Sequence, residues 1–443
     1  MMSSKFGKIL DLICTPPTNY AVLTYGQQWL SLLNKIKRSH NIKRDVFFLF
    51  WMTFHLGLSF ALTPLSALLH AFGYRFLSVD LKQIGSILWL DLYLRDNLTT
   101  KKIPKHKIIV ARSRYTDANT YGFNLYAPYV TFIYSPFLRL LLYPFFMNIF
   151  FQERVAPYEH TYPMRKDAAH TDPCKAQSSF QRYQKQFGTA LCRLPEDEIA
   201  RGRQELSTLM NFERPFITFH VRDSGFYKES VPSLRNGDVR SCELAIQYLI
   251  EQGYNVVRAG TPSAESIDDM LEKYKPHLID YAKSNIRSDF LDCFLASQCR
   301  FYLGGSSGYT SLPAVFETPS CLVNFYNATL ILGFGASDLS SFKKFRYIDD
   351  DSLVPFHDIV RKPLSDNPSA EAMRKLNIRL DNNTPEEILE TVKEFIRSDR
   401  NILSPAQLSA KQHMPAWNYC FEAQGNFSNA ILKEYVDTHK LNS

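Results

Sequence analysis

The sequence predicts an α/β protein with two doubly wound, largely parallel sheets, preceded by an apolar helical segment. Three observations lead to this class. Short apolar strands alternate with helical patterns along 75–111 and again along 215–326. Polar and charged residues follow the predicted strands, at the ends where parallel sheets bind ligands. A run without Asp, Glu, Lys or Arg, at 46–74, comes before the first strand.

Length and composition limit the classes of function. The chain has 443 residues, of which 45% are hydrophobic and 21% charged, as in a globular protein with two cores. The net charge of +7 comes without a stripe of basic and aromatic residues, so we expect no nucleic acid. A phosphate-bearing ligand or an anionic membrane surface would use this charge. The eight cysteines form no CxxC or zinc-type spacing, which favours a reducing compartment. No signal peptide is evident.

We divide the chain into four regions. The first, 1–74, is basic and apolar and is expected to associate with a membrane. Its cations gather just before the apolar run, and Pro64 interrupts that run; the cations are Lys35, Lys37, Arg38, Lys43 and Arg44. The segment 46–74 would span a membrane, dip into one leaflet as a broken helix, or form a buried pair of core helices.

The second region, 75–200, reads as the first α/β domain. Strands are predicted at 75–79 and 107–111, with a helix at 86–97 between them. An aromatic insert follows at 129–151, where Pro136 and Pro144 argue against one long helix. The insert is either domain core or an exposed apolar patch that serves as a second membrane contact or an acceptor groove.

The third region, 201–400, carries the second α/β domain, and 401–443 is a tail expected to pack back across the domains. Strands are predicted at 215–221, 254–260, 277–282 and 320–326. The helix at 242–253 ends at Gly253, and a later helix has a cap at Thr384 with Pro385 in its first turn. The stretch 289–324 reads as helix, strand, glycine-rich turn and helix.

The glycine-rich turn is the first candidate binding element. Free backbone N–H groups at Ser306, Ser307 and Gly308, together with the two serine hydroxyls, suit the phosphates of a nucleotide. The alternative is an ordinary turn whose serines cap the next helix. Arg222, Arg235 and Arg258 follow other strands or loops of the same sheet, where they would bind phosphate oxygens or form ion pairs.

The remaining candidates are one histidine and three acids. His220 ends a strand and would take part directly or orient an arginine. Asp223 would act as a general base toward an acceptor hydroxyl, or hold an arginine in place. Asp289 and Asp292 share a helix face and would read a nucleobase or ribose, or supply helix N-terminal charge. No acidic pair demands a divalent metal, so we expect a metal-independent reaction without a further cofactor.

These residues lie in motifs that resemble a family of bacterial glycosyltransferases of surface-polysaccharide synthesis. The motifs are HVRDSGFY, the pair Arg235-Asn236, VVRAG with Gly260, IDYAKS, SDFLDCFLASQCRFYLGGSSG and FETPSCLVN, and the likeness covers about 75–330. HVRDSG is more distantly similar to the HxRxxD strand end of GT-B fucosyltransferases. That resemblance implies that Arg222 contacts the diphosphate of the donor and that Asp292 reads its nucleobase. It also places the two turn serines at the phosphates.

The wider pattern is incomplete, because Gly225, Phe226 and Tyr227 stand where HxRxxD places its final acid. The resemblance therefore implies nucleotide-sugar binding more than fucose. It implies a GT-B enzyme with two Rossmann-like domains facing a cleft. Such an enzyme would transfer a sugar to a glycan or lipid-linked acceptor of O-antigen, capsule or similar polysaccharide, at the inner face of the cytoplasmic membrane. The rival classes are a non-catalytic scaffold of a polysaccharide assembly complex and a sugar-nucleotide-modifying enzyme. The latter should show GxGxxG after its first strand.

Overall fold

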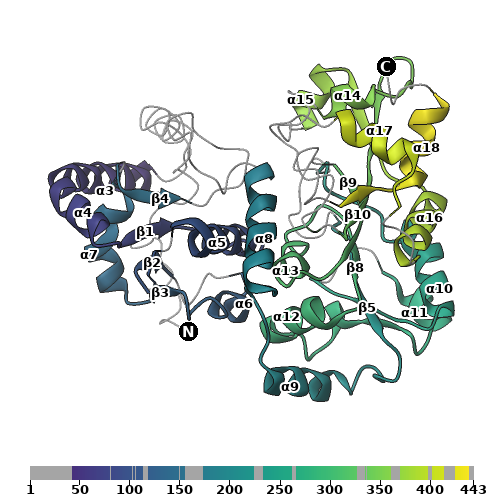
Figure 1. Ribbon diagram of the computed structural model, residues 1–443, viewed down its shortest axis with the longest axis horizontal. Helices are drawn as coiled ribbons and strands as arrows, with labels where there is room; N and C mark the ends of the chain where they lie inside the picture. The colour runs from purple at the N-terminus through teal and green to yellow at the C-terminus, as the bar shows by residue number, and fades with distance from the viewer. Residues whose placement is uncertain are drawn as a thin grey trace. The chain divides into compact units, whose positions relative to one another are not determined.

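The computed structural model describes most of the chain beyond residue 41. The described ranges are 42–79, 81–101, 103–104, 106–112, 118–148, 150–154, 173–223, 233–261, 266–326, 335, 337–360, 370–397, 402–413 and 425–438. Part of the predicted basic cluster (35–38) and the departure at 225–227 lie outside these ranges. The chain divides into two compact units, Met1–Thr171 and Asp172–Ser443 (Figure 1).

The first unit contains a four-stranded parallel sheet in the order β3-β2-β1-β4. Its elements are α3 (Ile42–Ala61), α4 (Thr63–Ala71), β1 (Arg75–Ser78), α5 (Ser86–Asp96), the π-helical η1 (Asn97–Lys101), β2 (Ile108–Ala111), α6 (Thr120–Asn124), β3 (Val130–Ile133), α7 (Pro136–Phe146) and β4 (Gln152–Arg154). The predicted strands and the helix between them are confirmed. Every residue of α5 is buried, so this helix forms the centre of the unit.

The apolar run 46–74 folds as two helices with a break at Leu62. Pro64 stands in the first turn of α4, where its missing N–H costs no hydrogen bond. Within the described ranges, no single helix is long and apolar enough to cross a membrane. Thr53–Ala61 and Thr63–Ala71, bent by 61°, reach that length and composition only together.

The aromatic insert 129–151 supplies β3 and α7. Pro136 opens α7 after the cap Ser135, and Pro144 lies in the last turn of the same helix. Phe145 of α7 stacks on Phe76 of β1, with ring centroids 5.1 Å apart. The buried imidazole of His55, on α3, lies 4.5 Å from the ring of Tyr143. The two apolar segments of the sequence therefore pack against each other.

The second unit contains a seven-stranded parallel sheet in the order β13-β10-β9-β8-β5-β6-β7. Its strands are β5 (Phe216–His220), β6 (Asn255–Arg258), β7 (Leu278–Asp280), β8 (Tyr302–Gly304), β9 (Ser320–Phe325), β10 (Leu339–Phe342) and β13 (Asn426–Phe427); β11 (Lys344–Tyr347) and β12 (Ile378–Asp381) form a separate antiparallel pair. The prediction of a doubly wound parallel sheet is confirmed here.

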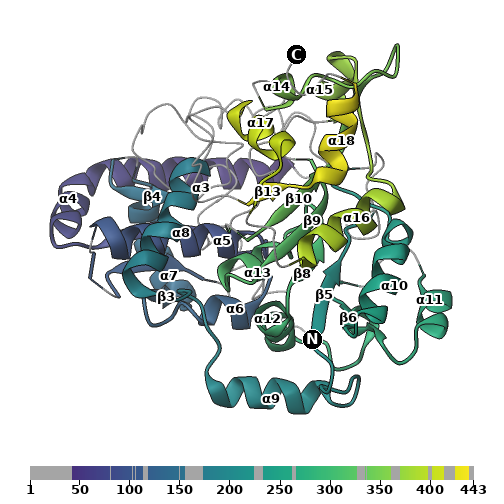
Figure 2. The same ribbon diagram turned by 45° about the vertical axis from the view of Figure 1, so that its right-hand side comes forward.

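Helices cover both faces of this sheet (Figure 2). The helices of the unit are α8 (Pro173–Phe187), α9 (Glu196–Leu206), η4 (Arg240–Cys242), α10 (Glu243–Glu251), α11 (Asp268–Lys273), η5 (Tyr281–Lys283), α12 (Asp289–Gln298), α13 (Ser311–Val315), α14 (Phe356–Ile359), α15 (Ala370–Lys375), α16 (Pro385–Ile396), α17 (Pro405–His413) and α18 (Asn429–Asp437). Ile217 and Phe219 of β5 point into a core shared with α10 and α16. Thr218 points the other way and donates to the Leu295 carbonyl of α12 at 2.9 Å.

Several helix ends have a local cause that is visible in the sequence. Gly253 follows α10 with φ +88°, and its N–H bonds to Ile250 O at 3.0 Å. Thr384 and Glu387 form a reciprocal capping box at the start of α16. The C-terminal segment adds β13 beside β10, and α18 packs on α16 and α17 of the same unit.

Candidate functional site

The carboxyl ends of β5 and β8 form the topological switch point of the second sheet. From β5 the chain crosses to β6 and β7 on one side, while β8 leads to β9 and β10 on the other. The loops leaving a switch point diverge and open a crevice where such sheets bind ligands. His220 ends β5 and stands in register with Gly304, the last residue of β8. The predicted site residues around these strand ends therefore share one edge of the sheet.

The buried His220 ring connects three strand ends. Its Nδ1 lies 3.0 Å from Ala259 O after β6, and its Nε2 lies 2.9 Å from Ser307 Oγ after β8. A carbonyl only accepts, so Nδ1 carries the proton and the Ser307 hydroxyl donates to Nε2. Burial lowers the pKa of His220 to about 4 against the effect of the Ala259 contact, so the ring is neutral near pH 7. His220 thus positions the turn rather than supplying charge.

Gly260 makes room for that ring. Its φ is +94°, and a Cβ placed on it would lie 2.5 Å from Nδ1 of His220. An L-residue at this position would meet both the left-handed backbone and the imidazole. The motif VVRAG therefore has a structural reason to end in glycine.

The turn after β8 presents backbone donors. Across the described ranges, the N–H groups of Gly305, Ser306, Ser307 and Gly308 make no hydrogen bond with the protein. Consecutive free N–H groups of this kind suit an anion. Ser306 Oγ accepts from Tyr326 N at 3.3 Å, which ties the turn to β9. The helix that follows, α13, has only five residues, so the turn itself provides the donors.

Arg222 and Asp223 directly follow β5. The carbonyl of Arg222 accepts from Gly237 N at 2.9 Å, which joins the strand end to the loop 233–238. Asp223 is buried at 9% exposure. The charges of both residues act on His220: Asp223 raises its pKa and Arg222 lowers it. Both predicted catalytic residues therefore lie at the switch point.

Arg235 and Asn236 reach the turn from the loop 233–238. Arg235 Nε donates to Ser306 O at 3.2 Å, so its guanidinium lies beside the glycine turn. The backbone oxygen of Asn236 accepts from Lys343 Nζ at 2.6 Å. Arg235 therefore contacts the glycine turn directly, and Asn236 links the same loop to Lys343 after β10.

Arg258 is held differently from the other arginines. Its Nη1 lies 3.3 Å from Asp280 Oδ2 at the end of β7, and both side chains are buried. The two residues are register partners of adjacent strands. Burial raises the pKa of Asp280, and the Arg258 charge opposes that shift. Of the two roles expected for these arginines, phosphate binding or an ion pair, Arg258 shows the ion pair.

Asp289 and Asp292 occupy the first turn of α12, which Ser288 caps by accepting from Leu291 N at 3.2 Å. Asp289 is half-buried, whereas Asp292 is 8% exposed. Burial raises the pKa of Asp292 to about 7, with Arg287 and the Tyr281 hydroxyl opposing. Its Oδ1 has no hydrogen-bond partner in the part of the chain that the structure describes. The carboxyl is therefore a buried acceptor near neutral pH.

Three residues near the site were missed from the sequence. Lys343 directly follows β10, Asn324 lies near the end of β9, and Tyr326 directly follows β9. A lysine pair inside the otherwise apolar and hydroxyl-bearing stretch SSFKKF was the available signal for Lys343. Within the described residues, no three His, Cys, Asp or Glu side chains gather as a metal site. The cysteines whose burial the structure describes are all buried; they are Cys192, Cys242, Cys293, Cys299 and Cys321.

The comparisons with known proteins give weak likenesses. No protein-family model matches the sequence, and no curated protein matches it. The chain is similar to a glycosyltransferase family 9 structure from Veillonella parvula at 13% identity, covering 57% of this chain and 81% of that one, with TM-score 0.35. It is also similar to ADP-heptose lps heptosyltransferase II of E. coli at 13% identity, 56% and 84% coverage, and TM-score 0.38. The dodecameric iron-containing glycosyltransferase TibC of enterotoxigenic E. coli matches at 12% identity, 58% and 59% coverage, and TM-score 0.32. Structural similarities with TM-scores this low establish neither the fold nor the activity of this protein. The assignment of its fold therefore rests on the observed strand order.

Proposed function

We propose that this protein is a glycosyltransferase that moves a sugar from a nucleotide-sugar donor to a glycan or lipid-linked acceptor. The observation that carries the proposal is the convergence at one switch point of arginines from two other segments with turn N–H groups that have no partner among the described residues. Arg222 follows β5, and the Arg235 side chain bonds to the turn at Ser306 O. Such a set suits the diphosphate of a sugar nucleotide.

In the proposed reaction, an acceptor hydroxyl attacks the anomeric carbon of the donor. The bond between that carbon and the diphosphate oxygen breaks, and the nucleoside diphosphate leaves. Arg222, Arg235 and the turn N–H groups would stabilise the negative charge that grows on the leaving oxygen. Asp223, as a carboxylate beside the switch point, would take the proton of the attacking hydroxyl. These residues supply the charge neutralisation, and the proposal needs no metal for it.

The second unit would hold the donor, with Asp292 as the acceptor for a nucleobase or ribose group. The first unit would hold the acceptor, in keeping with the GT-B resemblance of the sequence. The same resemblance supports a place in bacterial surface-polysaccharide synthesis. Likeness to fucosyltransferases supports nucleotide-sugar binding and does not name the sugar.

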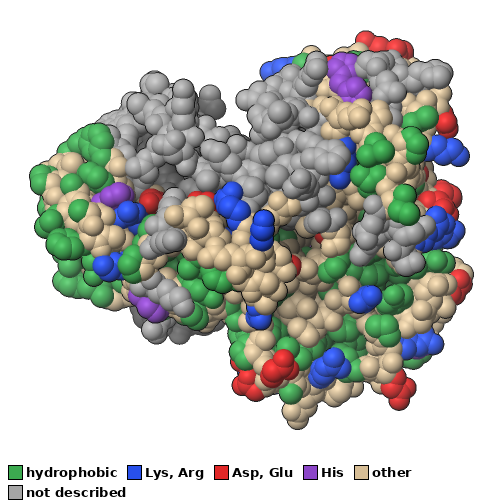
Figure 3. Space-filling view, viewed as in Figure 1, with side chains coloured by type: hydrophobic (Ala, Val, Ile, Leu, Met, Phe, Trp, Pro, Cys, Tyr) green, Lys and Arg blue, Asp and Glu red, His purple; other side chains and the backbone are tan. Residues whose placement is uncertain are grey.

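We further propose that the first unit docks on the cytoplasmic face of the membrane. Large apolar side chains stand exposed on α3 and α7 and at the C-terminal end of α4. Among them are Phe50, Phe72 and Phe137 at 68%, 62% and 71% exposure. Apolar side chains gather over the end of this unit that carries α4 and α7 (Figure 3). An exposed apolar surface of this kind fits an acyl-chain boundary better than water.

The first test is a thermal-shift screen of the purified protein against GDP-, UDP-, ADP-, CMP- and dTDP-sugars. We expect one nucleotide class to raise the melting temperature, and Arg222→Ala to abolish the rise. Lys393→Ala is the matched control, because the Lys393 amine lies on α16 and pairs with Glu390. Slow release of the nucleoside diphosphate by the wild type, absent in Asp223→Asn, would support transferase chemistry. Folded protein that responds to no nucleotide would favour the scaffold alternative.

A further inference from the structure

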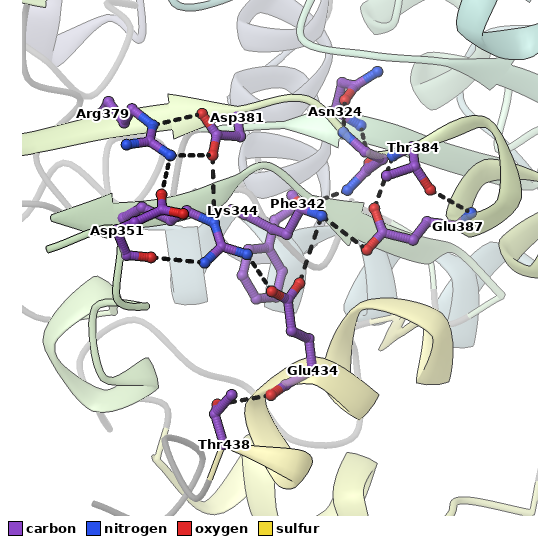
Figure 4. A network of polar contacts seen from close by, with 12 residues as sticks. Asn324, Phe342, Lys344, Asp351, Arg379, Asp381, Thr384, Glu387, Glu434 and Thr438 are labelled. Carbon is purple, nitrogen blue, oxygen red and sulfur yellow. Dashed lines mark hydrogen bonds and ion pairs between the residues drawn. The ribbon is translucent and has the colours of Figure 1, made fainter. Parts of the chain in front are cut away.

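Two consecutive lysines after β10 have opposite surroundings. Lys344 Nζ lies 3.0 Å from Glu387 Oε1 and 3.5 Å from Glu434 Oε2, so two carboxylates neutralise it (Figure 4). Lys343 is 4% exposed, and its amine bonds to the backbone oxygen of Asn236. Over the described ranges, no carboxylate lies within 4.0 Å of the Lys343 amine.

Burying an ammonium group with only a carbonyl beside it costs stability. Lysine is almost never fully buried unless it is paired, because desolvation disfavours its charge. Burial alone lowers the pKa of Lys343 to about 8, so the group is still mainly cationic at pH 7. An apolar side chain of similar length would fill this position without that cost. We therefore expect the Lys343 cation to serve a role other than stabilising the fold.

The neighbours of Lys343 belong to the candidate site. Asn236 follows Arg235, which bonds to the glycine turn and also makes no ion pair within the described part of the chain. Asn324, at 3% exposure, has its Nδ2 buried without an acceptor among the described residues. A Cβ built on Gly237 would lie 3.6 Å from that Nδ2, so the unused donor faces the same loop.

We propose that Lys343, Arg235 and the Nδ2 of Asn324 form an oxyanion subsite on the β9–β10 side of the glycine turn. The subsite rests on the proposed function and extends its donor site. Among the residues that the structure describes, these two cations meet no carboxylate and the amide donor meets no acceptor. Asn236 Oδ1, also buried without a partner in the described ranges, would accept from a hydroxyl beside the anion. The oxyanion is either the diphosphate or an acidic group on the transferred sugar.

The test measures binding of inorganic pyrophosphate by calorimetry, alongside thermal unfolding. If the anion is the diphosphate, we expect Lys343→Met to weaken pyrophosphate binding at least tenfold. In either case the melting temperature should stay equal or rise, because a buried charge is removed. Lys344→Met is the control, and should keep the affinity but lower the melting temperature, since it leaves Glu387 and Glu434 without their cation. If Lys343→Met lowers the melting temperature without changing any ligand's affinity, the lysine only supports Asn236 and the subsite is wrong.

A second variant tests the subsite without removing the lysine. Asn324 Oδ1 accepts from Asn383 N at 2.6 Å, so Asn324→Asp keeps that acceptor and replaces the unused donor with negative charge. We expect it to weaken anion binding at least tenfold. The proposal would be overturned if both variants bound pyrophosphate and the sugar phosphates described below as well as the wild type does. It would also be overturned if the wild type bound none of them.

Two further probes identify the source of the anion. If Lys343 binds the diphosphate, Lys343→Met weakens the binding of pyrophosphate. It then also weakens the binding of glucose 1-phosphate and of glucuronic acid 1-phosphate to the same extent. If it binds an acidic sugar, only glucuronic acid 1-phosphate is affected. Should nucleoside diphosphates bind wild type and Lys343→Met equally, with no effect on the sugar phosphates, the subsite fails and the glycosyltransferase proposal stands. Conversely, Lys343→Met could lose pyrophosphate binding while the wild type binds no nucleotide. In that case the subsite stands and the glycosyltransferase proposal is wrong.

Discussion

The imidazole of His220 lies 2.9 Å from the hydroxyl of Ser307, across the switch point of the second sheet. Its other nitrogen bonds to the chain just before Gly260. One neutral ring therefore fixes the glycine turn against two neighbouring strand ends. Because the ring itself is buried, any group that enters its space should disturb the turn and the folding of the sheet together.

The first prediction concerns that space. Gly260→Ala should destabilise the protein by about 2 to 5 kcal/mol, from a left-handed backbone and a Cβ 2.5 Å from the His220 ring. Gly253→Ala is the matched control, because Gly253 has φ +88° and nothing within 4 Å of its Cβ. It should cost only about 1 to 2 kcal/mol. Urea unfolding compares the free energies of unfolding of the two variants. Equal losses would mean that the His220 ring moves aside without cost.

The second prediction separates two roles of Arg258. Arg258→Met should destabilise by about 3 to 5 kcal/mol, because it leaves the buried Asp280 carboxylate unpaired. The double variant Arg258→Met/Asp280→Leu should recover most of that loss. If Arg258 also contacts the donor, the double variant is stable but binds nucleotide more weakly. A stable double variant with wild-type nucleotide binding would restrict Arg258 to the ion pair.

The third prediction is a pH dependence from Asp292. Burial raises its pKa to about 7 from an ordinary 3.8, so the folded protein binds more protons than the unfolded chain between these values. The resulting stability is fully present below pH 4 and is lost as the pH rises through 7. Asp292→Asn should therefore stabilise the protein more at pH 8 than at pH 5. A difference in unfolding free energy that does not change with pH would contradict this environment for the carboxyl.

The fourth prediction concerns the exposed apolar side chains of the first unit. Phe72→Ser and Phe137→Ser together should reduce co-sedimentation with vesicles of mixed neutral and anionic lipid, without lowering the melting temperature. Both rings are exposed, so no core contact is lost. Ile402→Ser, at an 82% exposed position of the second unit, is the control and should bind like the wild type. Vesicle binding unaffected by the double change would remove this surface from the proposal.

Much of the fold was predictable because its signals are local. Alternating strands and helices indicated the parallel sheet, and Gly253, Pro64 and Thr384 marked helix ends that the structure confirms. The strands β10 and β13 were not predicted. They have four and two residues, with serines or asparagine among them, and are held by pairing with distant strands.

The sequence by itself determined that the candidate groups follow parallel strands, because a parallel sheet brings all its carboxyl ends to one edge. It did not determine which charges meet there. Strand register placed Asp280 opposite Arg258. Among the described residues, two carboxylates pair with Lys344 and none pairs with its buried neighbour Lys343. Charge pairing depends on distances of a few ångströms between segments far apart along the chain. Only the tertiary structure sets those distances.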